Sequence, residues 1–207
     1  MTRTCVIIGA SHAAAQLVIS LRQEGWQDYL KKHLRYGGKV IGICGGYQML
    51  GEQLRDPLGL ENPHPDTQSS GFGLIPMETV LEKDKQLKQR QGILSFTTKS
   101  TDVTGYEIHS GVSRFSQNVM HFCVLENGEK EGYVSNDNQI IGTYLHGVFD
   151  HPDALHALLN WAGVKNAASF DYDQYRDSEI NRLADSAEQH INIDALIKTC
   201  RAFQKNN

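Results

Sequence analysis

The spacing of apolar positions in the first fifty or so residues predicts an alternation of buried strands and helices. Residues 4–9 and 39–43 are short runs rich in Val and Ile, which is typical of strands buried on both faces. Apolar positions recur at helical spacing in residues 11–24, 27–35 and about 46–55. A β-α-β-α order of this kind favours a parallel sheet covered by helices.

The middle of the chain predicts short strands, and the end predicts helices. Residues 56–72 are rich in Pro, Gly and Ser and predict a loop. Strand candidates follow at 73–80, 92–97, 103–109, 120–126, 131–136 and 139–145. We interpret the charge-rich stretch 82–91 as a solvated turn between strands, with a partner-binding segment as the alternative. The helical pattern returns at 153–162, 173–189 and 191–204.

Composition and charge narrow the class of protein. The 207 residues suffice for one medium domain, residues 1–207, and 40% hydrophobic and 21% charged residues are typical of a globular protein. The net charge of −4 gives no electrostatic reason to expect binding to nucleic acid or to an anionic membrane. No apolar run approaches the roughly 18–20 residues of a membrane span, and the N-terminus lacks the layout of a signal peptide.

The cysteines indicate a reducing compartment. The four are far apart in the sequence, without a Cys-x-x-Cys pair or metal-ligand spacing: Cys5, Cys44, Cys123 and Cys200. Free thiols in the cytoplasm are the simplest interpretation, and we expect no bound metal.

Cys44 stands at the most informative position of the chain. The strand predicted over 39–43 delivers it directly into Gly45 and Gly46, after which the apolar spacing becomes helical. A strand-to-helix corner with flanking glycines has the geometry of a nucleophile elbow, and the helix N-terminus favours a thiolate. The alternative is that Cys44 is only a small buried apolar residue.

A cysteine nucleophile needs a base, and His146 is the best candidate among the nine histidines. It ends the strand-like run 139–145 and is followed by Gly147. This predicts a place at a sheet edge, where the active sites of α/β folds gather. The alternative is a histidine whose ring is satisfied by backbone groups.

Several segments resemble, in the same order, the class I glutamine amidotransferase domain of cobyric acid synthases. The resemblance covers roughly residues 22–165 and extends into the tail. Its motifs are Gly42–Gly51, Asp56–Glu61, Gly71–Pro76, Gly105–Gly111 and Gly142–Asp150. It implies a flavodoxin-like, mainly parallel sheet flanked by helices. It also implies that a cysteine attacks the side-chain amide of glutamine, forms a glutamyl thioester and releases ammonia, while a histidine moves the proton.

The resemblance assigns expected roles to particular residues. Cys44 is the nucleophile and His146 the general acid/base, while backbone N–H groups around Gly45 donate to the oxyanion. Gln48 matches a position that lines the glutamine pocket. The motif residues Tyr106, Glu107 and His109 have no settled role, and structural support and substrate contact both stay open.

One position departs from the wider class. Many class I amidotransferases carry a glutamate two residues after the histidine, which orients the imidazole. Val148 stands at that position here. The cobyric acid branch also tends to lack this glutamate, so the departure is in keeping with the branch.

The resemblance also implies parts that this sequence does not contain. Cobyric acid synthases carry an ATP-dependent synthetase part with a phosphate-binding loop, and no Gly-x-x-x-x-Gly-Lys-Ser/Thr motif occurs in residues 1–207. We therefore expect that ATP and Mg²⁺ chemistry, and with it the amidation of a corrin substrate in cobalamin biosynthesis, needs a partner domain. We also expect the amidotransferase domain to be truncated at its N-terminus.

The N-terminal segment resembles a different family. Residues 4–26 are similar to the start of a FAD-dependent ferredoxin reductase, but Gly9–Ala14 holds one glycine where that family has Gly-x-Gly-x-x-Gly. We expect no FAD binding. Our hypothesis is a chimera joined near Leu21–Trp26, in which strand 4–9 lies beside strand 39–43 and Gly9 supplies a backbone oxyanion donor.

Two other functions stay open at this point. A truncated or recombined protein without catalysis would act by binding or self-association, and a homodimer would cover an exposed sheet edge. A flavin-binding module would rest on residues 4–26 alone.

Overall fold

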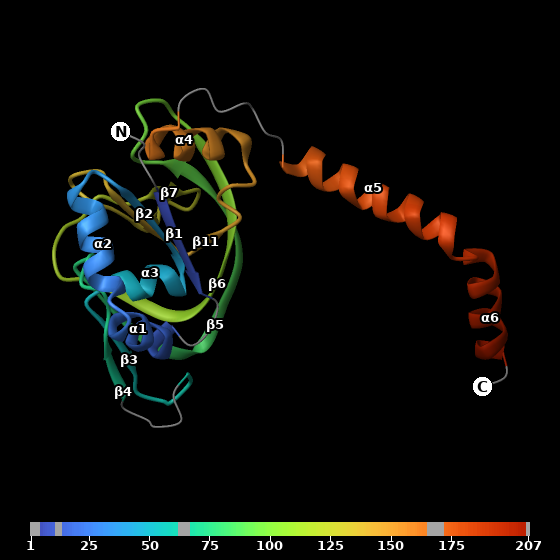
Figure 1. Ribbon diagram of the computed structural model, residues 1–207, viewed down its shortest axis with the longest axis horizontal. Helices are drawn as coiled ribbons and strands as arrows, with labels where there is room; N and C mark the ends of the chain where they lie inside the picture. The colour runs from blue at the N-terminus through green and yellow to red at the C-terminus, as the bar shows by residue number, and fades with distance from the viewer. Residues whose placement is uncertain (1–4, 11–13, 62–66, 165–171, 206–207) are drawn as a thin grey trace. The chain divides into compact units, whose positions relative to one another are not determined.

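A four-stranded sheet contains β1 and β2, which lie side by side (Figure 1), and the second of these strands ends at Cys44. Its strands are β1 (Cys5–Ala10), β2 (Lys39–Cys44), β9 (Tyr133–Val134) and β10 (Ile140–Thr143), in the order β1-β2-β10-β9. β1 and β10 pair with β2 in parallel, and β9 closes the other edge in antiparallel orientation. The computed structural model describes residues 5–10, 14–61, 67–164 and 172–205. The predicted α/β class with a mainly parallel central sheet is confirmed.

The alternation of side chains along this sheet sorts the apolar residues into two cores. Val40 and Ile140 are partners in adjacent strands and belong to one core, whereas their neighbours Ile41 and Ile141 belong to the other. The first core packs against α1 (Ala14–Gln23), α2 (Trp26–Arg35) and α3 (Gly45–Leu50). The second packs against α4 (Pro152–Ala162). Burial on both faces explains why β2 and β10 are continuous apolar runs.

A second sheet of seven strands contributes to both cores, with Leu54 and Met77 in the first and Leu94 and Val103 in the second. Its strands are β3 (Gln53–Asp56), β4 (Thr67–Ser70), β5 (Met77–Leu94), β6 (Asp102–Phe115), β7 (Cys123–Leu125), β8 (Lys130–Glu131) and β11 (Leu145–His146). The main order is β11-β6-β5-β3-β4, with β7 joined to β5 and β8 to β7. The long pair β5 and β6 curves past β1, while α1, α2 and α3 lie on the other side (Figure 1).

The interpretation of residues 82–91 as a turn is wrong. They lie inside β5, which pairs with β6 from Met77 opposite Phe115 to Ile93 opposite Asp102. The register shifts once, between Leu81 and Gln86. Most of the described side chains in this stretch are exposed, so a strand with a solvated face tolerates charges that the sequence pattern associates with a turn.

The helix predicted over 46–55 is shorter than expected. It ends at Leu50, because Gly51 adopts an extended conformation (φ −65°, ψ −178°) and the chain continues as β3. The predicted loop 56–72 contains a second strand, β4, and residues 62–66 lie outside the described part. The helix predicted over 11–24 is present from Ala14 onward, and residues 11–13 are not described.

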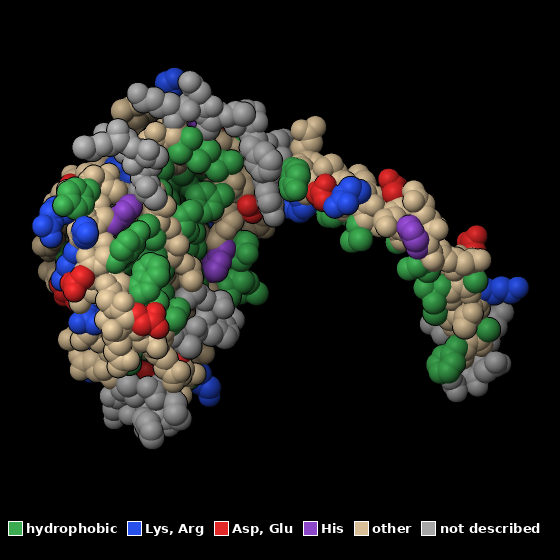
Figure 2. All heavy atoms as spheres, viewed as in Figure 1, with side chains coloured by type: hydrophobic (Ala, Val, Ile, Leu, Met, Phe, Trp, Pro, Cys, Tyr) green, Lys and Arg blue, Asp and Glu red, His purple; other side chains and the backbone are tan. Residues whose placement is uncertain are grey.

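The chain divides into two compact units, Met1–Ser169 and Phe170–Asn207. The second unit consists of α5 (Tyr172–His190) and α6 (Ile193–Lys205), which confirms the two helices predicted there. Apolar side chains are visible along both helices in Figure 2 and include the exposed Ile180, Leu183, Leu196, Ile197 and Phe203. The expectation that residues 1–207 form one domain stays a prediction.

Candidate active site

Cys44 lies at a strained corner between β2 and α3. Its backbone has φ 53° and ψ −115°, a conformation that residues with a side chain rarely adopt, and it is the N-cap of α3. The corner is held by close packing, since a Cβ atom on Gly46 would lie 1.9 Å from the carbonyl oxygen of Ile8 in β1. The paired glycines therefore let the helix begin directly against the neighbouring strand. The geometry predicted for a nucleophile elbow is present.

The thiol of Cys44 faces strand β6. Only 4% of the residue is exposed, and Sγ donates a hydrogen bond to the carbonyl oxygen of Ile108 at 3.4 Å. Burial raises the pKa of the Tyr144 phenol to about 12, and the charge of a Cys44 thiolate would add a smaller increase. The sulfur thus lies between the central sheet and the segment that follows β10.

His146 lies in the short strand β11, opposite Tyr106 of β6. The two rings stack with centroids 5.2 Å apart and planes 8° apart. Nε2 is buried and has no hydrogen-bond partner among the described residues. Burial lowers the pKa of His146 below its ordinary value of 6.5. The ring is therefore mostly neutral at pH 7, and none of the described groups forms a hydrogen bond with its Nε2.

The fold brings Cys44 and His146 to the same part of the molecule. β2 and β10 are parallel neighbours, Cys44 ends β2, and His146 follows shortly after the end of β10. Both then meet strand β6 within two residues, Cys44 at Ile108 and His146 at Tyr106. The sequence predicted that the fold would bring these two residues together, whereas their pairing in catalysis stays a prediction.

Strand β1 fills the slot beside β2. In the parallel register Gly9 is opposite Ile43, and Ala10 is opposite Cys44. The carboxyl end of β1 therefore reaches the nucleophile corner, as the sequence predicts for strand 4–9. The amide of Gly45 begins α3 immediately after Cys44, so Gly9 and Gly45 stand on the two sides of the corner as candidate backbone donors.

Gln48 is buried one helical turn after Cys44, on the same side of α3. Its Nε2 donates to the hydroxyl of Tyr144 at 3.4 Å, and that hydroxyl forms a 2.5 Å hydrogen bond with the Ser113 hydroxyl. A Cβ atom on Gly111 would lie 2.5 Å from Gln48 Nε2. The glycine that ends the Tyr106–Gly111 motif therefore provides room for this amide.

The remaining motif residues, Tyr106, Glu107 and His109, contact different partners. Tyr106 stacks on His146, whereas Glu107 is buried and accepts a 2.9 Å hydrogen bond from Arg90 Nε. His109 stacks on Tyr144 with centroids 3.8 Å apart, and its Nδ1 contacts the Gly111 carbonyl at 2.8 Å. Burial is the main cause that lowers the pKa of His109. Glu107 and His109 line a cavity of about 420 Å³. The ion pair of Glu107 favours structural support for that residue.

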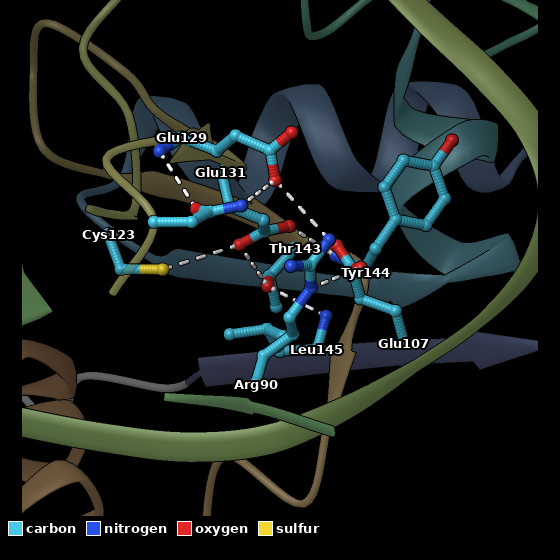
Figure 3. Close-up of polar contacts among 9 residues, drawn as sticks. Arg90, Glu107, Cys123, Glu129, Glu131, Thr143, Tyr144 and Leu145 are labelled. Atoms are coloured by element: carbon cyan, nitrogen blue, oxygen red, sulfur yellow. Dashed lines mark hydrogen bonds and ion pairs between the residues drawn. The ribbon is translucent and has the colours of Figure 1, made fainter. Parts of the chain in front are cut away.

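The sequence reasoning missed Glu131 and Tyr144, which adjoin the candidate residues. Glu131 of β8 is 6% exposed and receives hydrogen bonds from Thr143 and Tyr144 (Figure 3). Burial raises the pKa of its carboxyl from 4.5 to about 7. A charged residue at the start of the apolar strand candidate 131–136 was a usable signal, because buried carboxyl groups need dedicated partners.

Two further features bear on the class of site. Within the described ranges, no three His, Cys, Asp or Glu side chains gather closely enough to hold a metal ion. Among the helices that the structure describes, none is long and apolar enough to cross a membrane.

Comparison with known proteins identifies the relatives of this chain. Residues 2–154 match the family model of the CobB/CobQ-like glutamine amidotransferase domain. The cobyric acid synthase of Marinomonas sp. (strain MWYL1) is 68% identical over 208 residues, an alignment that covers 97% of this chain and 41% of that protein. The chain thus spans about two fifths of the length of this curated relative.

Solved structures support the fold alone. A crystal structure of glutamine amidotransferase matches with a TM-score of 0.53 at 14% identity, over 77% of this chain and 79% of the other. PurLQS from Thermotoga maritima matches with a TM-score of 0.51 at 12% identity, over 77% of this chain and 98% of the other. Both agree with the α/β architecture around β2.

The extent of the family match bears on the N-terminal segment. The match begins at residue 2 and therefore includes residues 4–26, for which a reductase origin was considered. Nothing in the comparisons supports that origin. The chain belongs to the family of CobB/CobQ-like glutamine amidotransferase domains.

Proposed function

We propose that this chain hydrolyses glutamine to glutamate and ammonia, with Cys44 as nucleophile and His146 as general acid/base. The observation that carries the proposal is that both residues meet strand β6 at Tyr106–Ile108. Cys44 does so from a strained corner, and His146 with a buried Nε2 that has no hydrogen-bond partner in the described part of the chain. A buried thiol and a buried imidazole nitrogen that meet the same strand are suited to nucleophilic catalysis.

The chemistry proceeds in two halves. In the first, His146 takes the thiol proton, Cys44 Sγ bonds to the side-chain carbonyl carbon of glutamine, and the C–N bond breaks as the proton passes to the leaving ammonia. In the second, water gives a proton to His146 and attacks the thioester, the C–S bond breaks, and the proton returns to sulfur. Backbone N–H groups of Gly45 and Gly9 stabilise the oxyanion, and Gln48 lines the pocket for glutamine.

The ammonia serves a second reaction in the longer protein. The relative named cobyric acid synthase is more than twice the length of this chain. In this proposal the ammonia is used for ATP-dependent amidation of corrin carboxylates in cobalamin biosynthesis. In this proposal a synthetase partner or domain provides ATP and Mg²⁺ binding and the corrin site. The chain works in the cytoplasm, where a reducing environment preserves the Cys44 thiol.

Glutamate release from glutamine tests the proposal. The purified chain is compared with Cys44→Ala and with Cys200→Ser, a matched control because Cys200 is an exposed thiol on α6. We expect hydrolysis by the wild type and by Cys200→Ser, and background release by Cys44→Ala. Equal release by all three proteins, at the rate of glutamine in buffer, would refute the proposal.

One observation favours a second candidate, a protein that associates through β1. This strand is at an edge of the four-stranded sheet, and Ile7 at its middle is 56% exposed. An exposed strand edge invites pairing with another chain, so a homodimer is the corresponding proposal. Ile7→Lys and wild type are compared by analytical ultracentrifugation. A monomeric wild type at micromolar concentration would exclude the dimer.

The reductase-like origin of residues 4–26 stays a separate prediction. We expect no flavin to bind, because residues 9–14 hold a single glycine. The absorbance of the protein between 350 and 500 nm after incubation with FAD and desalting measures this. A retained flavin spectrum would restore the flavin-binding alternative.

A further inference from the structure

A buried carboxyl lies under the segment that carries His146. Glu131 Oε1 accepts a hydrogen bond from the backbone N–H of Tyr144 at 2.7 Å. Its Oε2 accepts a second from the Thr143 hydroxyl at 2.8 Å (Figure 3). The side chain is therefore anchored to the end of β10 at two points.

Thr143 extends this anchor by one residue. Its Oγ1 accepts a hydrogen bond from the backbone N–H of Leu145 at 3.0 Å while its hydroxyl donates to Glu131. The ladder between β10 and β2 ends at Thr143, and the ladder between β11 and β6 begins at Leu145. Glu131 and Thr143 thus satisfy the two backbone N–H groups at the point where the chain passes between the sheets.

We propose that Glu131 is a positioning residue for the glutaminase site, because its carboxyl fixes the backbone of Tyr144 and Leu145 and so aims His146 at Cys44. The inference rests on the proposed function. Glu131 acts through Thr143 and the backbone, not on the reacting atoms. Fixing a catalytic group through its neighbours is a general requirement for a reactive geometry.

The surroundings of Glu131 make a purely space-filling role a poor explanation. The groups that face it are Glu107 from β6, Cys123 from β7 and Tyr47 from α3, and Cys123 Sγ donates only a weak 3.7 Å hydrogen bond. Arg90 lies near but is engaged by Glu107 and Glu129. An apolar residue would avoid the cost of burying a carboxyl here. The hydrogen bonds that Thr143 and Tyr144 donate explain why a carboxyl occupies this position.

Ser135 provides a matched control at the other end of β10. Its buried Oγ accepts hydrogen bonds from the backbone N–H groups of Gln139 at 3.0 Å and Ile140 at 2.9 Å. Ser135 therefore supports two backbone amides as Glu131 and Thr143 do, but at the end of the strand remote from His146. Removing the Ser135 hydroxyl should lower the stability of the fold without changing the arrangement of Cys44 and His146.

The test uses Glu131→Leu, Glu131→Gln and Ser135→Ala in the full chain. The first readout is kcat and KM for glutamine, per Cys44 titrated with a glutamine-mimicking electrophile. The second readout is the pH dependence of Cys44 alkylation by iodoacetamide, followed on the Cys44 peptide by mass spectrometry. This second measurement reports the coupling of the thiol to His146 and requires no glutamine turnover.

Glu131→Leu should lower kcat between about tenfold and a hundredfold with KM changed less than about threefold. It should also shift the alkylation midpoint of Cys44 to higher pH, because the imidazole no longer faces the thiol. Glu131→Gln should retain kcat within about threefold, since the amide oxygen can accept from Tyr144 and the amide nitrogen can donate to Thr143. Ser135→Ala should match the wild type in both readouts.

Three results would overturn the inference. The first is a kcat per titrated site and an alkylation profile in Glu131→Leu equal to those of Ser135→Ala. The second is an equal loss in Glu131→Gln and Glu131→Leu, which would indicate that charge and not hydrogen bonding matters. The third result concerns the case in which Glu131→Leu does not fold, and it uses Thr143→Val, which removes only the bridging hydroxyl. A wild-type alkylation profile of Cys44 in Thr143→Val would then overturn the inference. An inactive wild type with a shifted profile in Glu131→Leu would refute the glutaminase and support the positioning role.

Discussion

The ring of Tyr106 stacks on the ring of His146, with planes 8° apart, in the position where the backbone of the two residues already pairs. In the wider amidotransferase class a glutamate two residues after the histidine would orient the imidazole, but Val148 occupies that place and is buried in the second core. The stack and the strand pairing thus set the plane of His146, while Nε2 is left without a partner among the described residues.

Replacing Tyr106 should therefore affect the rate of chemistry rather than the binding of glutamine. An aromatic pair contributes about 0.5–1.5 kcal/mol, which corresponds to a loss of about two- to tenfold in kcat for Tyr106→Ala. Tyr106→Phe keeps the ring and should keep the rate. Steady-state glutamine hydrolysis measures both variants, and an unchanged kcat in Tyr106→Ala would show that the stack does not orient the histidine.

The pH dependence of glutamine hydrolysis should report the burial of His146. Burial lowers the pKa of His146 from 6.5, because the charged imidazolium is disfavoured away from water. The base is active when neutral, so the acidic limb of kcat/KM should have its midpoint below pH 6.5. A pH–rate profile from 5 to 8 tests this. An acidic limb with its midpoint above pH 6.5 would contradict the neutral, desolvated ring.

Gly46 should tolerate no side chain, because of its contact with β1. A methyl group there would lie 1.9 Å from the carbonyl oxygen of Ile8, and backbone on both sides would have to move. Overpacking of this kind costs about 1–3 kcal/mol, so Gly46→Ala should lower the free energy of unfolding by that amount and reduce the yield of active enzyme. Urea denaturation measures the change.

Gly9→Ala is the matched control for this substitution. Gly9 lies in the same region, yet a Cβ atom on it would meet no described atom within 4 Å. Its free energy of unfolding should stay within about 0.5 kcal/mol of the wild type. Equal losses in Gly9→Ala and Gly46→Ala would mean that the close approach of α3 to β1 is not what constrains the corner.

The ion pair between Arg90 and Glu107 gives a prediction about stability. Both side chains are largely buried, at 14% and 10% exposure, and Arg90 Nε lies 2.9 Å from Glu107 Oε2. Arg90→Met leaves the carboxylate buried without its partner and should cost about 3–5 kcal/mol. Arg90→Met combined with Glu107→Leu should cost less than the single change. A double variant as unstable as the sum of its parts would show that the pair is not coupled.

The sequence predicted the parts of the molecule that depend on local patterns. Cys44 at a strand end before two glycines, and His146 at a strand end before one, are local signals, and the parallel arrangement of β1, β2 and β10 follows from short apolar runs separated by helices. A central strand buried on both faces has a distinctive composition, which is why β2 was recognisable.

The parts that the sequence did not predict depend on long-range contacts. Charges in residues 82–91 concealed β5, because its pairing partner β6 and its solvated side appear only in the fold. The environment of Glu131 arises from Thr143 and Tyr144, which are more than ten positions away in the sequence. Buried polar networks join residues from several strands, and no local pattern specifies them.

Protonation of Glu131 should make the free energy of unfolding depend on pH. Burial raises the pKa of its carboxyl from 4.5 to about 7, so the native state binds this proton more tightly than the unfolded chain does. The resulting stabilisation is fully present below pH 4.5 and is lost as the pH rises through about 7. Because one pKa unit corresponds to about 1.4 kcal/mol, the whole effect is on the order of 3 kcal/mol or less.

Glu131→Gln removes this titrating group and keeps the shape of the side chain. The difference in unfolding free energy between variant and wild type therefore reports the contribution of Glu131 protonation alone. We expect the variant to gain stability relative to the wild type as the pH rises from 5 to 8, with most of the change between pH 5 and 7. Contributions from His109 and His146 are common to both proteins and cancel in the difference. Urea denaturation at a series of pH values measures it. A difference that is constant from pH 5 to 8 would mean that Glu131 is charged throughout this range, held by the donors of Thr143 and Tyr144 more strongly than burial opposes it.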